Sequence, residues 1–299
     1  IYLQNYICLE NLHEPATFKY TFAFDNDIIE YEYKKWDPDN LVSEKLLVND
    51  KTLIDYHYGN STSNKNFIDD SIKGSLNIKL VDNKLSVIKY IYRNTPTDNN
   101  SIITKLVHFC ENMLWYRRLS DSSAYAGFSN GNHNFFDFIY EHGKTREFQD
   151  FLKRNGVDYQ LDFENINGIR QLLAYFKNGE IKTLFTSVAS TGTMALALFF
   201  AWTTIAFDKI SFLFTDEFDA FLHFESAKLI VEELNKCKGF QSIVTTHNTY
   251  LMQNKLTRPD CCYLMTQNKI ASLFNSTDKE IREAHNLEKM YVNGAFIDE

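Results

Sequence analysis

Glycine and proline are scarce in this sequence, with 11 and 4 among its 299 residues. Low-complexity linkers are rich in such residues, so the chain has little material for them. The 5 cysteines are scattered and lack CxxC pairs, which supports neither a zinc site nor a disulfide framework and favours a reducing, cytoplasmic location. We see no signal peptide and no uninterrupted apolar run of about 18 residues, so we expect neither secretion nor a membrane span.

Basic residues are fewer than acidic residues: the sequence has 31 Lys and Arg and 39 Asp and Glu, which gives a net charge of −8. This balance argues against wholesale attraction to nucleic acid or to an anionic membrane, although a local basic groove stays compatible with it. Hydrophobic residues make up 44% of the chain, with 25 Phe and 17 Tyr. The composition indicates a globular chain with a substantial core, and its charge favours a protein or nucleotide partner.

The first part of the chain has the pattern of antiparallel strands. Residues 17–24 and 28–35 alternate with period two around a short acidic turn, which predicts a hairpin. Further strands are expected at 44–48 and 53–57. We therefore expect an antiparallel β part over 1–85.

Helical spacing takes over from about residue 86. It covers 86–93, 102–118 and 135–154, where apolar residues recur every three or four positions. These helices predict a helical insertion over 86–160.

The remaining part, 161–299, alternates helices with strands. This alternation predicts an α/β fold with a mainly parallel sheet covered on both faces, to which the antiparallel β part and the helical insertion are added. The expected elements are hairpin strands 170–176 and 181–185, helix 193–207, strand 210–215, helix 224–236, strand 241–246, helix 248–254, strands 261–266 and 270–274, and helix 278–291.

Two adjacent carboxylates stand where a buried strand should end. Phe212 to Thr215 is suited to a strand buried on both faces, and Asp216 and Glu217 follow it. Ligands of open α/β sheets bind outside the carboxyl ends of the strands. An Asp there could hold Mg²⁺, and a Glu could take a proton from an attacking water. A buried strand that runs into an acidic loop without chemistry has the same pattern, so this alternative stays open.

A cluster of small hydroxyl residues precedes the long apolar helix. Ser190, Thr191, Gly192 and Thr193 follow a predicted strand, where backbone N–H groups, hydroxyls and the helix dipole favour a phosphate. The alternative is an ordinary N-cap.

A histidine ends another apolar strand. His247 follows the strand that begins at Gln241, one helix after Glu217, and a right-handed strand-helix-strand unit brings neighbouring strand ends close together. A neutral His there could bond a γ-phosphate or hold the attacking water, and the alternative is a purely structural His.

Together, these stretches resemble the C-terminal half of an ABC-type ATPase domain, a P-loop NTPase. By this resemblance, residues 189–193 are similar to the signature loop, Phe212 to Asp216 to Walker B, Glu217 to the catalytic base, and His247 to the switch histidine. The signature keeps only the Ser and the second Gly of the transporter form Leu-Ser-Gly-Gly-Gln.

Longer stretches resemble the AAA-type, ABC-fold ATPases of bacterial antiphage defence, among them the overcoming-lysogenisation-defect ATPases and ATPases paired with a TOPRIM or other nuclease. The resemblance implies ATP and Mg²⁺ as cofactors and a homodimer or higher oligomer, in which Ser190 and Gly192 of one protomer complete the site of the other. It also implies a nuclease or TOPRIM-type effector as protein partner. The matching stretches are 216–225, 245–252, 258–260 and 283–291.

The chain lacks a Walker A loop, G-x-x-x-x-G-K-[ST], which wraps the β- and γ-phosphates. Gly143-Lys144-Thr145 is a decoy, because Phe138 stands where the first Gly is required. Since this loop belongs upstream of the first strands and the sequence begins at Ile1, we expect a truncated N-terminus; genuine loss is the alternative. A DNA-repair or chromosome-maintenance ATPase, and a non-hydrolysing scaffold that sequesters an effector, also stay open.

Overall fold

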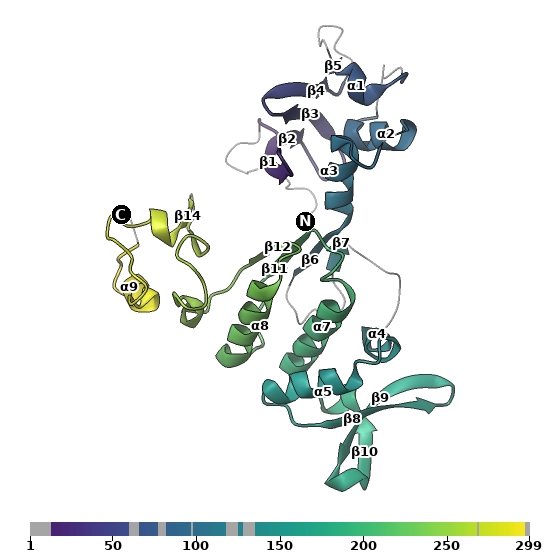
Figure 1. Ribbon diagram of the computed structural model, residues 1–299, viewed down its shortest axis with the longest axis vertical. Helices are drawn as coiled ribbons and strands as arrows, with labels where there is room; N and C mark the ends of the chain where they lie inside the picture. The colour runs from purple at the N-terminus through teal and green to yellow at the C-terminus, as the bar shows by residue number, and fades with distance from the viewer. Residues whose placement is uncertain are drawn as a thin grey trace. The chain divides into compact units, whose positions relative to one another are not determined.

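A computed structural model describes residues 13–59, 66–76, 82–96, 98–117, 125–127, 135–267 and 269–296. The chain divides into two compact units, Ile1–Glu111 and Asn112–Glu299 (Figure 1).

The first unit is built on a five-stranded antiparallel sheet in the order β1-β2-β3-β4-β5. The hairpin predicted from period-two alternation is confirmed, with Ala16 opposite Lys35 and Phe24 opposite Asp27. The helices α2 and α3 lie beside the sheet (Figure 1) and share its core. The elements are β1 (Ala16–Phe24), β2 (Asp27–Lys35), β3 (Leu41–Val48), β4 (Lys51–His57), β5 (Phe67–Ile68), α1 (Asp70–Lys73), α2 (Val87–Asn94) and α3 (Ile102–Glu111).

A fully buried carboxylate ties α2 to this sheet. The Oη atoms of Tyr31 and Tyr58 donate to the two carboxylate oxygens of Glu44 over 2.6 and 2.7 Å, and the backbone N of Val87 donates over 2.6 Å. Burial, reinforced by the nearby Glu44, raises the pKa of both tyrosines above its usual value. The first turn of α2 is thereby held against β3.

The second unit contains a four-stranded sheet in the order β12-β11-β6-β7, in which β11 runs parallel to β12 and β6. The helix predicted over 102–118 is therefore wrong from Met113 onward. Periodicity alone does not separate a short buried strand from a helical segment, and here pairing with a distant strand decides the conformation. The strands are β6 (Met113–Arg117), β7 (Tyr125–Gly127), β11 (Phe212–Asp216) and β12 (Gln241–Val244).

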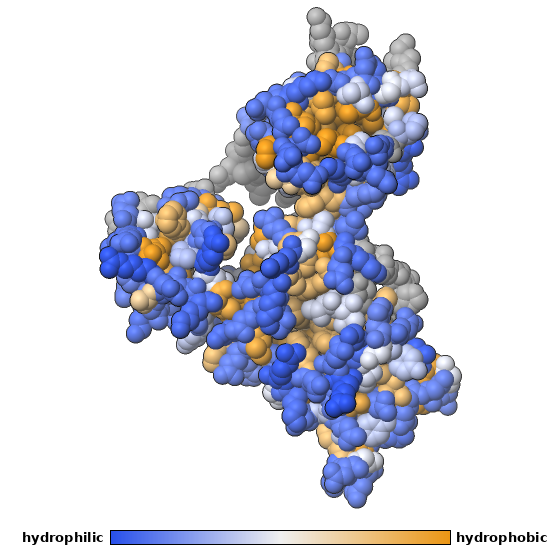
Figure 2. Space-filling model, viewed as in Figure 1, coloured by the Kyte–Doolittle hydropathy of each residue, from blue (hydrophilic) through white to orange (hydrophobic). Residues whose placement is uncertain are grey.

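The two faces of this sheet differ in burial. Leu114 and Leu213 are buried on the face that packs against the helices of the unit. On the opposite face, Trp115, Phe214 and Ile243 stand in one cross-strand row, where Trp115 is 40% and Ile243 45% exposed. The expected cover on both faces is thus incomplete among the described residues, and apolar surface is visible in the region of these strands (Figure 2).

The core of the second unit surrounds α7, in which every residue over 195–202 is buried. A helix that is apolar on all sides belongs in such a core. Phe148 and Phe151 of α5 pack on Phe200, with ring centroids 5.2 and 5.3 Å apart. The surrounding elements are α4 (Phe135–Glu141), α5 (Thr145–Arg154), β8 (Gln160–Ile166), β9 (Ile169–Phe176), η1 (Lys177–Gly179), β10 (Ile181–Leu184), α6 (Phe185–Val188), α7 (Thr191–Ile205) and α8 (Phe224–Lys236).

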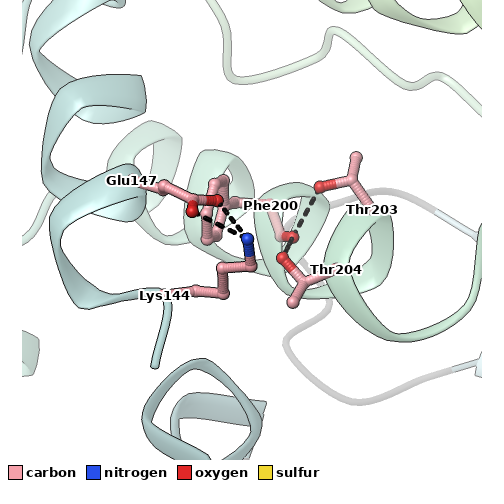
Figure 3. A network of polar contacts seen from close by, with 5 residues as sticks. All are labelled: Lys144, Glu147, Phe200, Thr203 and Thr204. Carbon is pink, nitrogen blue, oxygen red and sulfur yellow. Dashed lines mark hydrogen bonds and ion pairs between the residues drawn. The ribbon is translucent and has the colours of Figure 1, made fainter. Parts of the chain in front are cut away.

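Hydroxyl groups within the apolar α7 are satisfied locally. Thr203 and Thr204 both donate to the carbonyl of Phe200, over 2.7 and 3.0 Å (Figure 3). Such back-bonding lets a helix carry threonines without unpaired hydroxyls. Among the described residues, no helix has the length and apolar character needed to cross a bilayer.

The last part of the chain forms shorter elements than expected. The strands predicted at 261–266 and 270–274 reduce to a separate antiparallel ribbon of β13 and β14, and the helix predicted over 278–291 begins only at Leu287. Asn286 caps this helix by accepting from Lys289 N, which explains the late start. The elements are η2 (Thr249–Leu251), β13 (Tyr263–Met265), β14 (Ile270–Ser272), η3 (Leu273–Asn275) and α9 (Leu287–Val292).

These elements give a mixed α/β fold with one partly parallel sheet and separate antiparallel sheets, as the sequence predicts. The strands β6 and β7 lie within the range expected to be a helical insertion, yet they belong to the sheet of β11 and β12.

Candidate functional site

The two acidic residues stand at the carboxyl edge of the parallel strands. Asp216 is the last residue of β11, which lies between β12 and β6, and Glu217 follows it. Glu217 has a φ of 48°, in the left-handed region that costs a non-glycine residue about 1 kcal/mol or more. The chain therefore turns sharply after the strand and places both carboxylates at the edge where ligands bind.

Thr245 connects both acids to the neighbouring strand. Its Oγ1 donates to Asp216 Oδ1 over 2.6 Å and accepts from Glu217 N over 2.8 Å. Its backbone N donates to Thr215 O over 3.0 Å, and its carbonyl accepts from Phe218 N over 3.1 Å. Thr245 is not among the residues to which the sequence points individually, although it begins the stretch 245–252.

The next threonine continues this connection. Thr246 Oγ1 donates to Asp219 Oδ1 over 2.7 Å and accepts from Asn248 N over 2.9 Å. The loop after β12 is thus joined to the turn after β11 by two consecutive side chains. His247 lies in this loop, where it is exposed, on the same edge of the sheet as Asp216.

The hydroxyl cluster forms the start of α7. Ser190 is the N-cap, and its Oγ accepts from Thr193 N over 3.1 Å and lies 2.9 Å from Thr193 Oγ1. Ser190 and Thr191 are exposed, whereas Thr193 is buried. The N-cap alternative is therefore present in the structure, and it leaves the outer hydroxyls accessible.

Gly192 brings the start of α7 against the turn that follows the acids. A Cβ added at Gly192 would lie 2.5 Å from the carbonyl oxygen of Phe221. The turn is closed by Ala220 N donating to Glu217 O over 3.1 Å and by Leu222 N donating to Asp219 O over 2.9 Å. The hydroxyl cluster and the acids are therefore neighbours through backbone packing.

The donor set at this edge has the chemistry that Mg²⁺ requires. Mg²⁺ is usually held by one or two carboxylates together with substrate phosphates and waters, and Asp216 supplies one such carboxylate at this edge. Among the described residues no cluster of three or more His, Cys, Asp or Glu could hold a metal by itself. The site is thus suited to a metal that arrives with a phosphate ligand.

The stretch Gly143-Lys144-Thr145, which partly resembles a Walker A loop, belongs to other elements than the two acids. Gly143 ends the turn between α4 and α5 with a φ of 64°, and Thr145 begins α5. Lys144 Nζ donates to both carboxylate oxygens of Glu147 at 2.7 Å (Figure 3). A helix-turn-helix position with an engaged lysine does not form a phosphate loop, which must follow a strand.

Comparison with known proteins gives one family match. Residues 10–253 match the model of a family described as "AAA domain, putative AbiEii toxin, Type IV TA system". No curated protein matches the chain.

Two solved structures are similar to parts of the chain. They are described as "SMC head domain from Thermotoga maritima" and "Crystal structure of the SmcHead bound to the C-winged helix domain of ScpA". They share 13% and 15% sequence identity with this chain, with TM-scores of 0.34 and 0.33, and cover 80% and 78% of it. The chain spans 66% and 65% of their lengths, slightly less than two thirds.

Proposed function

The chain belongs to the family of AAA domains described as putative AbiEii toxins of type IV toxin–antitoxin systems, and we propose that it is an ATPase that binds and hydrolyses ATP with Mg²⁺. The observation that supports this most is the acid pair at the strand edge, held by one hydroxyl group. Hydrolysis of a phosphoanhydride uses a residue that holds the metal and a base near the attacking water, and the acid pair could supply both.

Each residue of the site takes a definite role in this proposal. Asp216 would hold Mg²⁺, which when bound screens the phosphate charge. Glu217 accepts a proton from the attacking water, because a carboxylate positioned at a hydrolytic centre is a suitable general base. His247 donates a hydrogen bond to the γ-phosphate or orients the water.

The start of α7 supplies the phosphate contacts in a homodimer or higher oligomer. Ser190 and Thr191 are exposed, so a second protomer has access to them, and Gly192 lies in the first turn, where backbone N–H groups favour an anion. The N–H of Thr193 is bonded to Ser190 Oγ, so Thr193 supports the start of the helix. A nucleotide held between two protomers would make hydrolysis conditional on association. ATP binding would then act as a switch that hydrolysis resets.

The switch controls a toxic effector in antiphage defence within the cytoplasm. This part rests on the resemblance of the stretches around Asp216 and Thr245 to defence ATPases and on the family description, which names a toxin–antitoxin system. The effector is of the nuclease or TOPRIM type, and the negative net charge favours a protein partner over direct binding to nucleic acid.

The test is phosphate release by the complete gene product, alone and with the protein encoded beside it. We expect Mg²⁺-dependent hydrolysis that Asp216→Asn lowers by about 10²-fold or more, because the variant removes the metal-holding charge. Glu225→Gln, an exposed substitution in the first turn of α8, serves as the control and should leave the rate unchanged. Absence of phosphate release under all these conditions would identify a non-hydrolysing scaffold.

A further inference from the structure

We infer that Thr245 is a positioning residue of the proposed ATPase site, which sets the orientation of both acids through one hydroxyl group. This inference rests on the proposed function. It is carried by the two hydrogen bonds of Oγ1, 2.6 Å to Asp216 Oδ1 and 2.8 Å from Glu217 N.

The direction of both bonds is fixed by chemistry. A backbone N–H can only donate, so the hydroxyl must accept from Glu217 N. Its own hydrogen is then available for the carboxylate of Asp216, which lies within hydrogen-bond distance. The hydroxyl therefore restricts rotation of the metal-holding carboxylate and fixes the backbone from which the base extends.

Backbone hydrogen bonds of Thr245 also constrain the residues on both sides of the acids, so that residues 215–218 are all held. Thr245 N and O bond Thr215 O and Phe218 N, on either side of the acids. A left-handed φ of 48° at Glu217 persists only where the surroundings hold it, and the bond from its N–H to Thr245 is such a constraint. The direction of the Glu217 side chain thus depends on a residue of the neighbouring strand end.

The adjacent threonine offers a matched control. Thr246 Oγ1 donates to Asp219, which is two residues beyond the base and has no proposed part in the chemistry. Thr245→Val and Thr246→Val each replace the hydroxyl group of a residue in this loop by a methyl group and keep the β-branched shape of the side chain. Only the first removes a contact with Asp216 and Glu217.

The experiment compares Thr245→Val, Thr245→Ser and Thr246→Val in the complete protein. The first readout is hydrogen exchange at the amide of Glu217, which requires no activity; the second is the Mg²⁺ concentration for half-maximal ATP hydrolysis. Loss of a residue that orients a metal ligand typically costs about 10- to 100-fold in metal affinity or activity. We expect a shift of this size, with faster exchange, in Thr245→Val, whereas Thr245→Ser, which retains the hydroxyl, should remain close to the wild type.

Each outcome decides one claim. Equal exchange and equal Mg²⁺ dependence in Thr245→Val and Thr246→Val would overturn the positioning role while hydrolysis by the wild type still supports the proposed function. A wild-type protein that releases no phosphate overturns the proposed function instead, and exchange at Glu217 then shows separately whether Thr245 holds the acid turn. A melting temperature measured for each variant separates either result from unfolding.

Discussion

Replacing Gly192 with alanine tests the close approach between the start of α7 and the acid turn. The new Cβ would lie 2.5 Å from Phe221 O, a distance that real Cβ atoms essentially never show, and 3.6 Å from Phe221 C. Because the neighbour is backbone within a hydrogen-bonded turn, it cannot swing aside as a flexible side chain would. Either the helix start or the turn has to move.

The magnitude follows from two opposing effects. Overpacking of a tight contact costs about 1–3 kcal/mol. Alanine is favoured over glycine in a helix by up to about 1 kcal/mol, which offsets part of this cost. We expect a net destabilisation of up to about 2 kcal/mol, or a fall in melting temperature of up to about 8 °C at 2–4 °C per kcal/mol.

Gly239→Ala is the matched control for this measurement. A Cβ added there meets no atom within 4 Å, and the φ of Gly239 is outside the left-handed region. The control should be neutral or stabilising by about 0.4–1 kcal/mol, because alanine restricts the unfolded chain. Thermal and urea unfolding of both variants measure this difference in stability. If Gly192→Ala unfolds at the same temperature as Gly239→Ala, the backbone contact does not have the proposed tightness.

Two further predictions concern the buried carboxylate of the first unit. The Glu44 carboxylate accepts three hydrogen bonds, and in Glu44→Gln the amide NH₂ group must face at least one of the three donors. We expect this change to lower the free energy of unfolding, measured in urea, by about 2–3 kcal/mol. As a control, Glu30→Gln breaks only a surface ion pair with Lys19 and should change the free energy of unfolding by less than about 0.5 kcal/mol. Equal effects would contradict the role of burial. Burial and Glu44 raise the pKa of Tyr58, so in alkali the unfolded state loses this proton first; the stabilisation is complete below about pH 10 and declines as the pH rises further. Tyr58→Phe should therefore flatten the loss of stability above about pH 10, and an unchanged slope there would refute this explanation.

Local patterns were sufficient to predict several of the regular elements. The alternation over β1 and β2 predicted the first hairpin, and α8 spans the predicted residues 224–236. The hairpin of strands 170–176 and 181–185 was also predicted, and its loop contains Asn178 and Gly179, both with the positive φ that tight turns use. In each of these cases the deciding interactions lie within a few residues along the chain.

One strand that depends on a distant partner was predicted as a helix. The strand β6 has the spacing of a continuing helix, and only its pairing with β11, about a hundred residues later, makes it extended. The site shows the same limit. Asp216 and Glu217 were recognised from the strand they end, whereas Thr245 acquires its role from a hydrogen bond to a residue 29 positions away. In both cases the structure depends on contacts between residues far apart in the sequence, and the spacing of residues along the chain does not predict such contacts.

Glu217 is proposed to act as the base of an ATP-hydrolysing site. The most direct measurement compares steady-state phosphate release and ATP binding of the complete protein with those of Glu217→Gln at saturating Mg²⁺ and ATP. Removing a general base lowers the rate by about 10²- to 10⁴-fold. We expect a fall of this size with ATP binding retained and the nucleotide-bound dimer trapped. Turnover equal to that of the wild type would rule out Glu217 as the base.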